Sequence, residues 1–337
     1  MTDAKFISII MPIYNEENFI VNCIDSLLLQ DYPQEAMEWI FVDGSSTDRT
    51  RSLIQNYIKK YPKLIKLLDN PKKTVPYAMN IGIHVAKGEY IIRLDAHADY
   101  SKDYLSKCVH YLNTTNADNV GGIAETKSNG VLGNCIAKML SSKFGVGNSQ
   151  FRTNGKSGFV DTVPFGAFRK SVFEKLGGYD ERLTRNQDNE MNYRIRKNGG
   201  LIYLANDIQF SYYCRDTIKG LADMALKNGM WNVITMYLCP GTMGIRHFIP
   251  LFFLLSIILL PILSLIFQPF FFLLGIELAL YFILDIYYSF KFSYNLKTFF
   301  ILLILYPLFH ITYGFGSLMG ISKLLFTNSF KRGVTKS

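Results

Sequence analysis

The sequence predicts an α/β fold followed by a membrane region: a sheet flanked by helices, then an amphipathic connecting helix, then transmembrane helices. In residues 1–215, strand-like apolar runs alternate with segments whose apolar residues recur at helical spacing, which is typical of doubly wound sheets. From residue 248 onward, three apolar tracts follow, each able to cross about 30 Å of hydrocarbon.

Two strand-like runs open the chain. Residues 6–14 are the first, and residues 15–30 then carry apolar side chains at helical spacing. Residues 38–48 are the second run, in which Asp43 begins the polar end, and Thr47 is placed to cap the helix that follows. Strand and helix therefore alternate, which predicts a layer built with crossover helices.

Two more strand-like runs continue the same order. Residues 63–69 form the third run, a helix is expected over 76–88 with Gly88 as its stop, and residues 89–95 form the fourth run. In such sheets, ligands bind beyond the carboxyl ends of the strands. The polar residues that follow these runs are therefore candidate site residues.

Three clusters of polar residues lie at these strand ends. Tyr14 and Glu16 follow the first run, Asp43 ends the second, and Asp95 and His97 follow the fourth. A nucleotide needs an aromatic face, acceptors for base N–H groups and ribose hydroxyls, and a cation for its phosphates. Tyr14 supplies the first, Asp43 with Asp95 the second, and a metal at Asp95 and His97 the third. Oxygen with imidazole ligation suits Mn²⁺ or Mg²⁺, with the imidazole favouring Mn²⁺.

Four segments of the chain, in order and at the right spacing, resemble the signatures of family 2 glycosyltransferases with the GT-A fold. They resemble above all the membrane-anchored bacterial enzymes of exopolysaccharide assembly, of the succinoglycan glucosyltransferase type. The likeness covers residues 1–215 well and extends loosely into the membrane region. The segments are IIMPIYNEE, FVDGSSTDRT, YIIRLDAHADY and RNQDNEMNYRIRKNGG. The resemblance implies a GT-A mixed sheet and an enzyme that uses a nucleotide sugar.

The resemblance also implies roles for the strand-end residues in donor binding. Pro12, Tyr14 and Glu16 would line the nucleotide pocket, and Asp43 would contact the uracil or the ribose. On its own, a carboxylate in the position of Asp43 often only caps a neighbouring turn or helix.

The segment Asp95-Ala96-His97 occupies the place of the family's D-x-D signature. Asp95 would face the nucleotide and His97 would bind the metal, since a neutral imidazole can ligate a divalent ion. His97 departs from the usual Asp at this position. The expected cofactor is a divalent metal, Mn²⁺ or Mg²⁺.

Asp188 matches the acid of the family's E-D signature, with Gln187 where Glu is usual. An inverting transfer needs one base to take the proton of the acceptor hydroxyl, and a carboxylate at the pocket mouth can do this. Asp188 is therefore the expected catalytic base. From the local sequence alone, Asp188 and Glu190 could instead only favour the helix dipole, with Glu190 paired to Arg194.

Two further segments are expected on the acceptor side. Residues 144–170, which include Arg152, form either a lid over the donor or an ordinary surface loop. Residues 216–238 form a helix on which Leu221, Met224 and Ala225 can share one face and Lys219 and Lys227 lie away from it. Trp231 and Tyr237 are types that favour the membrane interface. This helix is therefore expected to lie at the membrane interface. A plain linker or a helix packed on the catalytic core is the alternative.

The domain boundaries follow the composition. Residues 1–215 are the expected catalytic domain, 216–247 the connecting segment, 248–326 a membrane region of two to four spans, and 327–337 a basic tail. The three apolar tracts are 249–267, 269–290 and 299–322. The cationic residues that flank them are Arg246, Lys291, Lys297, Lys323, Lys331, Arg332 and Lys336. Pro307 and three glycines leave open whether the last tract breaks and returns.

Composition and charge predict a cell-membrane protein and argue against a nucleic-acid-binding protein and a secreted protein. The net charge is +9, but no dense Lys/Arg cluster or zinc-knuckle spacing indicates nucleic-acid binding. The start of the chain lacks the pattern of a signal peptide, and the five cysteines show no CxxC pairing, which together favour a cytosolic catalytic domain on a multi-pass membrane protein.

The expected function is the transfer of one sugar from a nucleotide sugar, a UDP-sugar, to a polyprenyl-diphosphate-linked acceptor in bacterial exopolysaccharide or capsule assembly. A processive polysaccharide synthase is one alternative, but residues 226–231 lack the Gln-x-x-Arg-Trp spacing of that class. A catalytically dead membrane scaffold is another, against which the intact Asp43, Asp95 and Asp188 argue. The sequence leaves the sugar, the linkage and the oligomeric state open.

Overall fold

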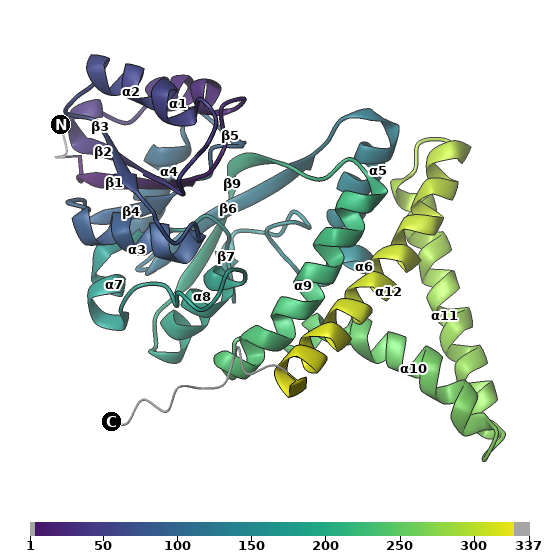
Figure 1. Ribbon diagram of the computed structural model, residues 1–337. Helices are drawn as coiled ribbons and strands as arrows, with labels where there is room; N and C mark the ends of the chain where they lie inside the picture. The colour runs from purple at the N-terminus through teal and green to yellow at the C-terminus, as the bar shows by residue number, and fades with distance from the viewer. Residues whose placement is uncertain (1–3, 327–337) are drawn as a thin grey trace, which may run out of the picture. The chain divides into compact units, whose positions relative to one another are not determined.

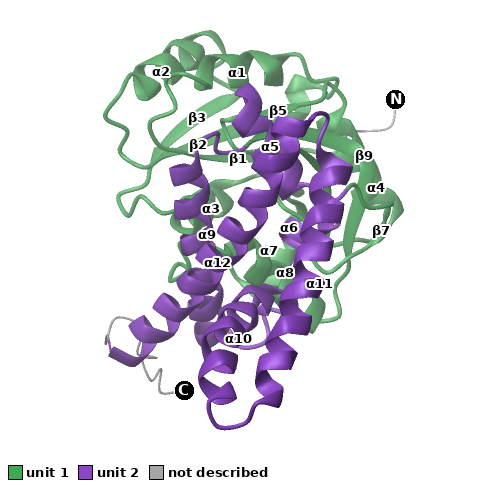
Figure 2. Cartoon of the chain, turned by 90° about the vertical axis from the view of Figure 1, so that its right-hand side faces the viewer, with its two compact units in different colours: residues 1–125, 154–213 green, residues 126–153, 214–337 purple. Residues whose placement is uncertain are grey.

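The computed structural model describes residues 4–326, so the predicted basic tail lies outside the described residues. The chain forms two compact units (Figure 2). The first contains residues 4–125 and 154–213, and the second contains residues 126–153 and 214–326. The predicted domain boundary at residue 215 agrees with residue 214, where the chain enters the second unit for the last time. The prediction missed residues 126–153, which also belong to the second unit.

One nine-stranded mixed sheet forms the centre of the first unit, in the order β3-β2-β1-β4-β8-β6-β9-β5, with β7 beside β9 (Figure 1). The strands are β1 (Ile7–Ile13), β2 (Met37–Asp43), β3 (Ile65–Asp69), β4 (Tyr90–Arg93), β5 (Ala98–Tyr100), β6 (Asn119–Lys127), β7 (Gly158–Phe159), β8 (Ala167–Arg169) and β9 (Ile202–Tyr213). The four runs predicted from the sequence are β1 to β4, and they pair in parallel.

The remaining strands make the sheet mixed. β8 pairs antiparallel with β4, and β5 pairs antiparallel with β9. β5 begins directly after His97, so the polar segment 95–97 connects two strands of the same sheet. The fold class predicted from the sequence is confirmed.

The helices of the first unit cover this sheet; α3 packs on β1 and β2, and α4 packs on β8 and β9. They are α1 (Ile20–Leu28), α2 (Thr50–Lys60), α3 (Val75–Val85), α4 (Tyr104–Thr114), α7 (Lys170–Leu176) and α8 (Gln187–Lys197), with a short 3₁₀ turn at Gln34–Ala36.

Two predicted helix ends differ from the structure. Thr47 does not cap α2; instead Asp48 Oδ1 accepts a hydrogen bond from the Thr50 N–H at 3.0 Å. α3 ends at Val85, before Gly88. Gly88 lies against β1, where a Cβ would be 2.4 Å from the Ser8 nitrogen, so this glycine permits close backbone approach and does not stop a helix.

The second unit is helical. Its helices are α5 (Gly130–Leu140), α6 (Lys143–Val146), α9 (Ile218–Leu238), α10 (Ile249–Ser264), α11 (Pro269–Phe292) and α12 (Leu296–Phe326), with a 3₁₀ turn at Ile245–His247. α11 and α12 are long and apolar enough to cross a membrane by length and composition, whereas α10 has 16 residues. α12 continues through Pro307, so the last tract does not break.

The apolar face of α9 is covered by protein. Leu221 and Ala225 are fully buried in one cluster with residues of α5 and α12, and Met224 packs on it. The face predicted to lie at the membrane interface therefore packs on α5 and α12. Lys227 remains exposed, and Trp231 is half-buried.

Glycines let α9 and α12 approach backbone to backbone. A Cβ on Gly316 would lie 2.2 Å from the Leu226 carbonyl oxygen, and one on Gly320 would lie 2.7 Å from the Met230 carbonyl oxygen. On the facing helix, a Cβ on Gly229 would lie 2.0 Å from the Tyr313 carbonyl oxygen. Such close crossings are typical of helices that pack in membranes through small residues.

Replacing Gly316 by Ala is expected to lower the melting temperature of the detergent-solubilised protein, because the new methyl group meets backbone atoms that cannot move aside; overpacking of this kind costs about 1–3 kcal/mol. Gly275→Ala on α11 is the matched control, since nothing lies within 4 Å of its added Cβ. Its melting temperature should stay or rise, because Ala favours helix over Gly. Equal behaviour of the two variants would contradict the close packing.

Candidate active site

The carboxyl ends of the parallel strands bring the predicted polar residues to one edge of the sheet. The register places Ile13 beside Asp43 and Asp43 beside Asp69, so the ends of β1, β2 and β3 are level. Tyr14 follows β1 directly, and its side chain is exposed. Pro12, within β1, is half-buried.

The loops after β1 and β2 are tied together at this edge. The side-chain oxygen of Asn15 accepts a hydrogen bond from the Thr47 N–H at 2.8 Å, and the Asn15 N–H donates to Ser46 Oγ at 2.9 Å. Asn15 and Ser45 both have positive φ, which tightens the two turns. Tyr14 is therefore presented from a fixed loop.

Asp43 is engaged inside the protein. Its side chain has no exposed surface. The Ser46 N–H and hydroxyl both donate to its carboxylate, and Arg51 Nη1 donates to Oδ2 at 2.6 Å. The same Arg51 nitrogen lies 2.7 Å from Asp69 Oδ1. Asp43 thus orders the turn and Arg51, and a direct contact of its carboxylate with a base or ribose stays a prediction.

The segment after β4 holds Asp95 and His97 in a defined conformation. The Asp95 N–H donates to the buried Tyr100 hydroxyl at 2.8 Å, which closes the loop onto β5. His97 Nδ1 lies 3.1 Å from Glu16 Oε1, so the first and fourth strand ends meet through this contact. Glu16 therefore points to His97, a partnership that the sequence did not reveal.

The residues present fit a divalent ion that is shared with a substrate. No cluster of three or more His, Cys, Asp or Glu side chains in residues 4–326 is arranged to hold a metal by itself. Mg²⁺-type sites commonly use one or two carboxylates together with substrate phosphates, and Asp95 is the carboxylate available for that mode beside His97. A carboxylate on the other ring nitrogen is the usual companion of a metal-binding histidine, and Glu16 occupies that place.

Asp188, the second residue of α8, forms an ion pair with Arg93, the last residue of β4. Arg93 Nη1 lies 2.6 Å from Asp188 Oδ1 and 2.8 Å from Oδ2, and Arg93 Nη2 lies 3.4 Å from Asp95 Oδ1. The structure therefore links the expected base to the expected donor aspartate through one guanidinium. The only signal in the sequence was a charged residue inside an apolar run.

Burial and neighbouring charges shift the pKa values of Asp188 and Arg93. Burial raises the pKa of Asp188, the positive charge of Arg93 lowers it, and the nearby Asp95 raises it; the net direction is up. Burial lowers the pKa of Arg93, but the two carboxylates more than offset this and raise it. Arg93 thus stays charged, and Asp188 is a better proton acceptor than an ordinary aspartate.

The neighbours of Asp188 have other partners. Glu190 is buried and accepts hydrogen bonds from Arg194 at 2.6 and 2.9 Å, the i, i+4 pair expected from the sequence. Gln187 is buried, and its Oε1 has no hydrogen-bond partner within the described part of the chain. α8 ends before Gly199, whose φ is +79°.

The predicted acceptor-side residues belong to the second unit. Arg152 lies in the segment 126–153, and Lys227 and Trp231 lie on α9. The stretch 144–170 is divided between the two units, since residues 154–170 return to the first unit with β7 and β8. It is therefore not one continuous loop.

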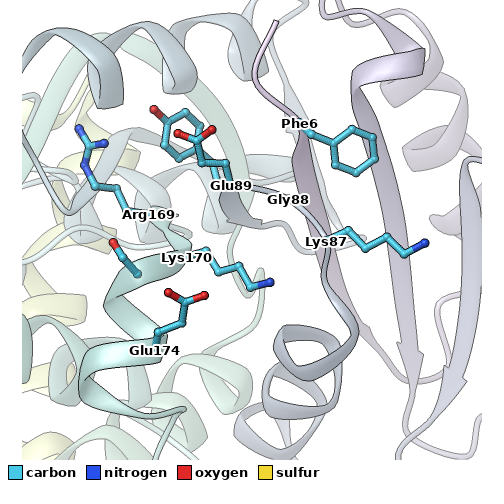
Figure 3. A pocket seen from close by; sticks show the side chains of 9 residues that line it. Phe6, Lys87, Gly88, Glu89, Arg169, Lys170 and Glu174 are labelled. Atoms are coloured by element: carbon cyan, nitrogen blue, oxygen red, sulfur yellow. The ribbon is translucent and has the colours of Figure 1, made fainter.

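A cavity of about 530 Å³ lies at the opposite edge of the sheet, where β1 and β4 begin (Figure 3). Two of its charged residues have partners: Glu89 pairs with Lys5 at 3.0 Å, and Lys170 Nζ donates to the Ala86 carbonyl at 2.9 Å. None of the predicted site residues lines it.

Comparison with known proteins gives consistent matches. Glycosyl transferase family 2 matches residues 8–177. A dolichyl N-acetyl-alpha-D-glucosaminyl phosphate 3-beta-D-2,3-diacetamido-2,3-dideoxy-beta-D-glucuronosyltransferase of Methanococcus voltae is 32% identical over 273 residues, 78% of this chain and 84% of that protein. The succinoglycan biosynthesis protein ExoA of Rhizobium meliloti (strain 1021) is 29% identical over 245 residues, 72% of this chain and 74% of that protein.

One solved structure shares the fold over nearly the whole chain. The mannosyltransferase PcManGT from Pyrobaculum calidifontis, in complex with GDP-Man and Mn²⁺, superposes with a TM-score of 0.65 at 18% identity, covering 97% of this chain and 89% of that one. At this identity the likeness is one of fold, and it agrees with a GT-A-like mixed sheet.

Proposed function

The chain belongs to glycosyl transferase family 2, and on that premise we propose that it is an inverting enzyme that moves one sugar from a UDP-sugar to a polyprenyl-diphosphate-linked acceptor in exopolysaccharide or capsule assembly. The observation that carries this proposal is the sheet edge at which Asp95, His97 with Glu16, and Asp188 with Arg93 converge.

The donor would bind at the carboxyl ends of β1, β2 and β4. The exposed Tyr14 ring is suited to stack on the base, beside Pro12. Asp43 would act on the uracil or ribose, either directly or through Arg51. Asp95 would face the nucleotide, and Glu16 would line the nucleotide pocket beside His97.

Asp95 and His97 would hold a divalent ion, Mn²⁺ or Mg²⁺, with Glu16 fixing the orientation of the imidazole. When bound, the ion would supply positive charge to the departing diphosphate. The Mn²⁺ in the PcManGT complex supports this choice of metal.

Asp188 would serve as the catalytic base. The acceptor hydroxyl oxygen forms a bond to the anomeric carbon while the bond from that carbon to the diphosphate oxygen breaks. The hydroxyl proton passes to an oxygen of Asp188, and the nucleoside diphosphate leaves. A single displacement of this kind inverts the configuration of the anomeric carbon.

The C-terminal helices would anchor the enzyme in the cell membrane as a multi-pass protein, with the catalytic domain in the cytosol. α11 and α12 are the candidate spans. Arg152, Lys227 and Trp231 would lie on the side of the lipid-linked acceptor. The name of the Methanococcus voltae relative, which includes a dolichyl phosphate-linked sugar, supports an acceptor of this class.

Incubation of the purified protein with UDP-, GDP- and TDP-sugars plus Mn²⁺ tests the proposal. One UDP-sugar should raise the melting temperature by mass action and should be consumed when a polyprenyl-diphosphate-sugar in liposomes is added. One added sugar per acceptor is the expected product, whereas a long chain would indicate a processive synthase. Absence of both binding and consumption across the panel would indicate a scaffold.

A further inference from the structure

We infer that Arg93 is a positioning residue that holds the Asp188 carboxylate in the orientation needed to accept the acceptor's proton. This inference rests on the proposed function, because it assigns a role relative to the base named there. Nothing in the local sequence around either residue predicts the pairing, since they are 95 positions apart.

Arg93 is held rigidly enough to position another group. It ends β4, whose neighbours are β1 and β8, and its own N–H donates to the Gly166 carbonyl at 3.1 Å. Its side chain is 6% exposed, and the guanidinium lies over the Phe165 ring at 5.2 Å. A buried guanidinium between strand, ring and carboxylates cannot change rotamer freely.

The contact geometry directs Arg93 toward Asp188 more than toward Asp95. One nitrogen, Nη1, reaches both oxygens of Asp188 at hydrogen-bond distance, whereas the single approach to Asp95 is 3.4 Å. Contact with both oxygens holds the carboxyl group of Asp188 against the guanidinium at the end of β4. Each oxygen retains further acceptor capacity, because a carboxylate offers about four lone-pair sites.

Asp188 depends on this contact. Arg93 is the donor to both of its oxygens among residues 4–326, and 25% of the Asp188 side chain is exposed. Without Arg93 the carboxylate could rotate toward water, and the proton-accepting oxygen would lose its alignment with the substrate. Misalignment of a catalytic group by about 1 Å can cost about 10²-fold in rate.

A double-mutant cycle with full-length protein tests the inference. Arg93→Gln should lower kcat about 10²-fold, and Arg93→Lys, which keeps one charged donor, should recover part of that loss. The KM for the donor should change less than threefold. In the Asp188→Asn background, adding Arg93→Gln should lower kcat no further than about threefold, because the positioned base is already gone.

Arg169→Gln is the matched control. Arg169 lies on the neighbouring strand β8, and its guanidinium donates to the backbone carbonyls of Ala117 and Leu112, with no ion pair to an acid within residues 4–326. Its replacement should affect the melting temperature without the kcat pattern above. If Arg93→Gln does not fold, the same cycle with Arg93→Lys decides.

Three outcomes would overturn the inference. The first is a double variant whose loss of kcat equals the product of the two single losses, and the second is an unchanged kcat in folded Arg93→Gln. The third is a higher KM for the donor with unchanged kcat, which would mean that Arg93 acts through Asp95 instead. Each requires that the wild-type protein transfers sugar. A wild-type protein without transfer activity would instead overturn the proposed function.

Discussion

Replacing Asp188 by Asn is expected to lower kcat by about 10²-fold or more, because the amide keeps the shape of the side chain but cannot accept the acceptor's proton. Binding of the nucleotide sugar should stay within about threefold of wild type, since Tyr14, Asp95 and His97 are unchanged. Steady-state transfer to a lipid-linked acceptor and donor titration measure the two quantities separately.

Glu190→Gln, two residues further along α8, is the control. Glu190 is buried and paired with Arg194, so its replacement should lower the melting temperature while kcat in the folded protein stays near wild type. A loss of turnover in Glu190→Gln together with normal turnover in Asp188→Asn would move the base to Glu190.

The pH profile reports on the same carboxyl. A base acts only when it is deprotonated, so with Asp188 as the proposed base kcat should fall as the pH decreases through its pKa. Burial raises this pKa, and Arg93 only partly opposes it, so the fall should begin at a higher pH than for a solvent-exposed aspartate. This acid limb should be absent from the residual activity of Asp188→Asn.

Removal of divalent ions is expected to abolish transfer, and Mn²⁺ or Mg²⁺ should restore it. His97→Ala should raise the metal concentration needed for half-maximal activity by about 10–100-fold, and Glu16→Gln should raise it less, because in the proposed site Glu16 orients the imidazole and does not bind the metal itself. Titration of the chelated protein with Mn²⁺ measures both effects.

Asp99→Ala is the control for this titration. Asp99 lies two positions beyond His97, is exposed, and accepts a hydrogen bond from the Tyr213 hydroxyl at 2.8 Å. Its replacement should leave the metal requirement as in wild type. Full transfer in the presence of excess chelator would contradict the assignment of Asp95 and His97.

The parallel strands β1 to β4 could be predicted from the sequence because they are buried. Buried parallel strands are continuous apolar runs, and the helices between them have a different period, so β1 to β4 are visible locally. The polar residues at their ends then lie at one edge by topology. Tyr14 and Asp43 can therefore be assigned to that edge from the sequence, whereas Pro12 is indicated only by the family resemblance.

The sequence does not reveal the contacts that join distant segments. Glu16 with His97 and Arg93 with Asp188 depend on how loops and helices fold back over the sheet. The sequence did not predict that residues 126–153 belong to the second unit. An amphipathic helix such as α5 has the same sequence pattern whether its apolar face packs on a sheet or on α12. For the same reason the apolar face of α9 was assigned to the membrane.

The placement of α5 in the helical unit affects how the chain is synthesised. The ribosome completes α5 at Leu140, but the α12 residues that cover it, Leu302 and Tyr306 among them, emerge roughly 160 residues later, ~8–30 s at ~5–20 residues per second. During that interval the apolar face of α5 has no α12 to pack on, and this uncovered surface is prone to aggregation. A chain that stops before α12 leaves this face uncovered permanently.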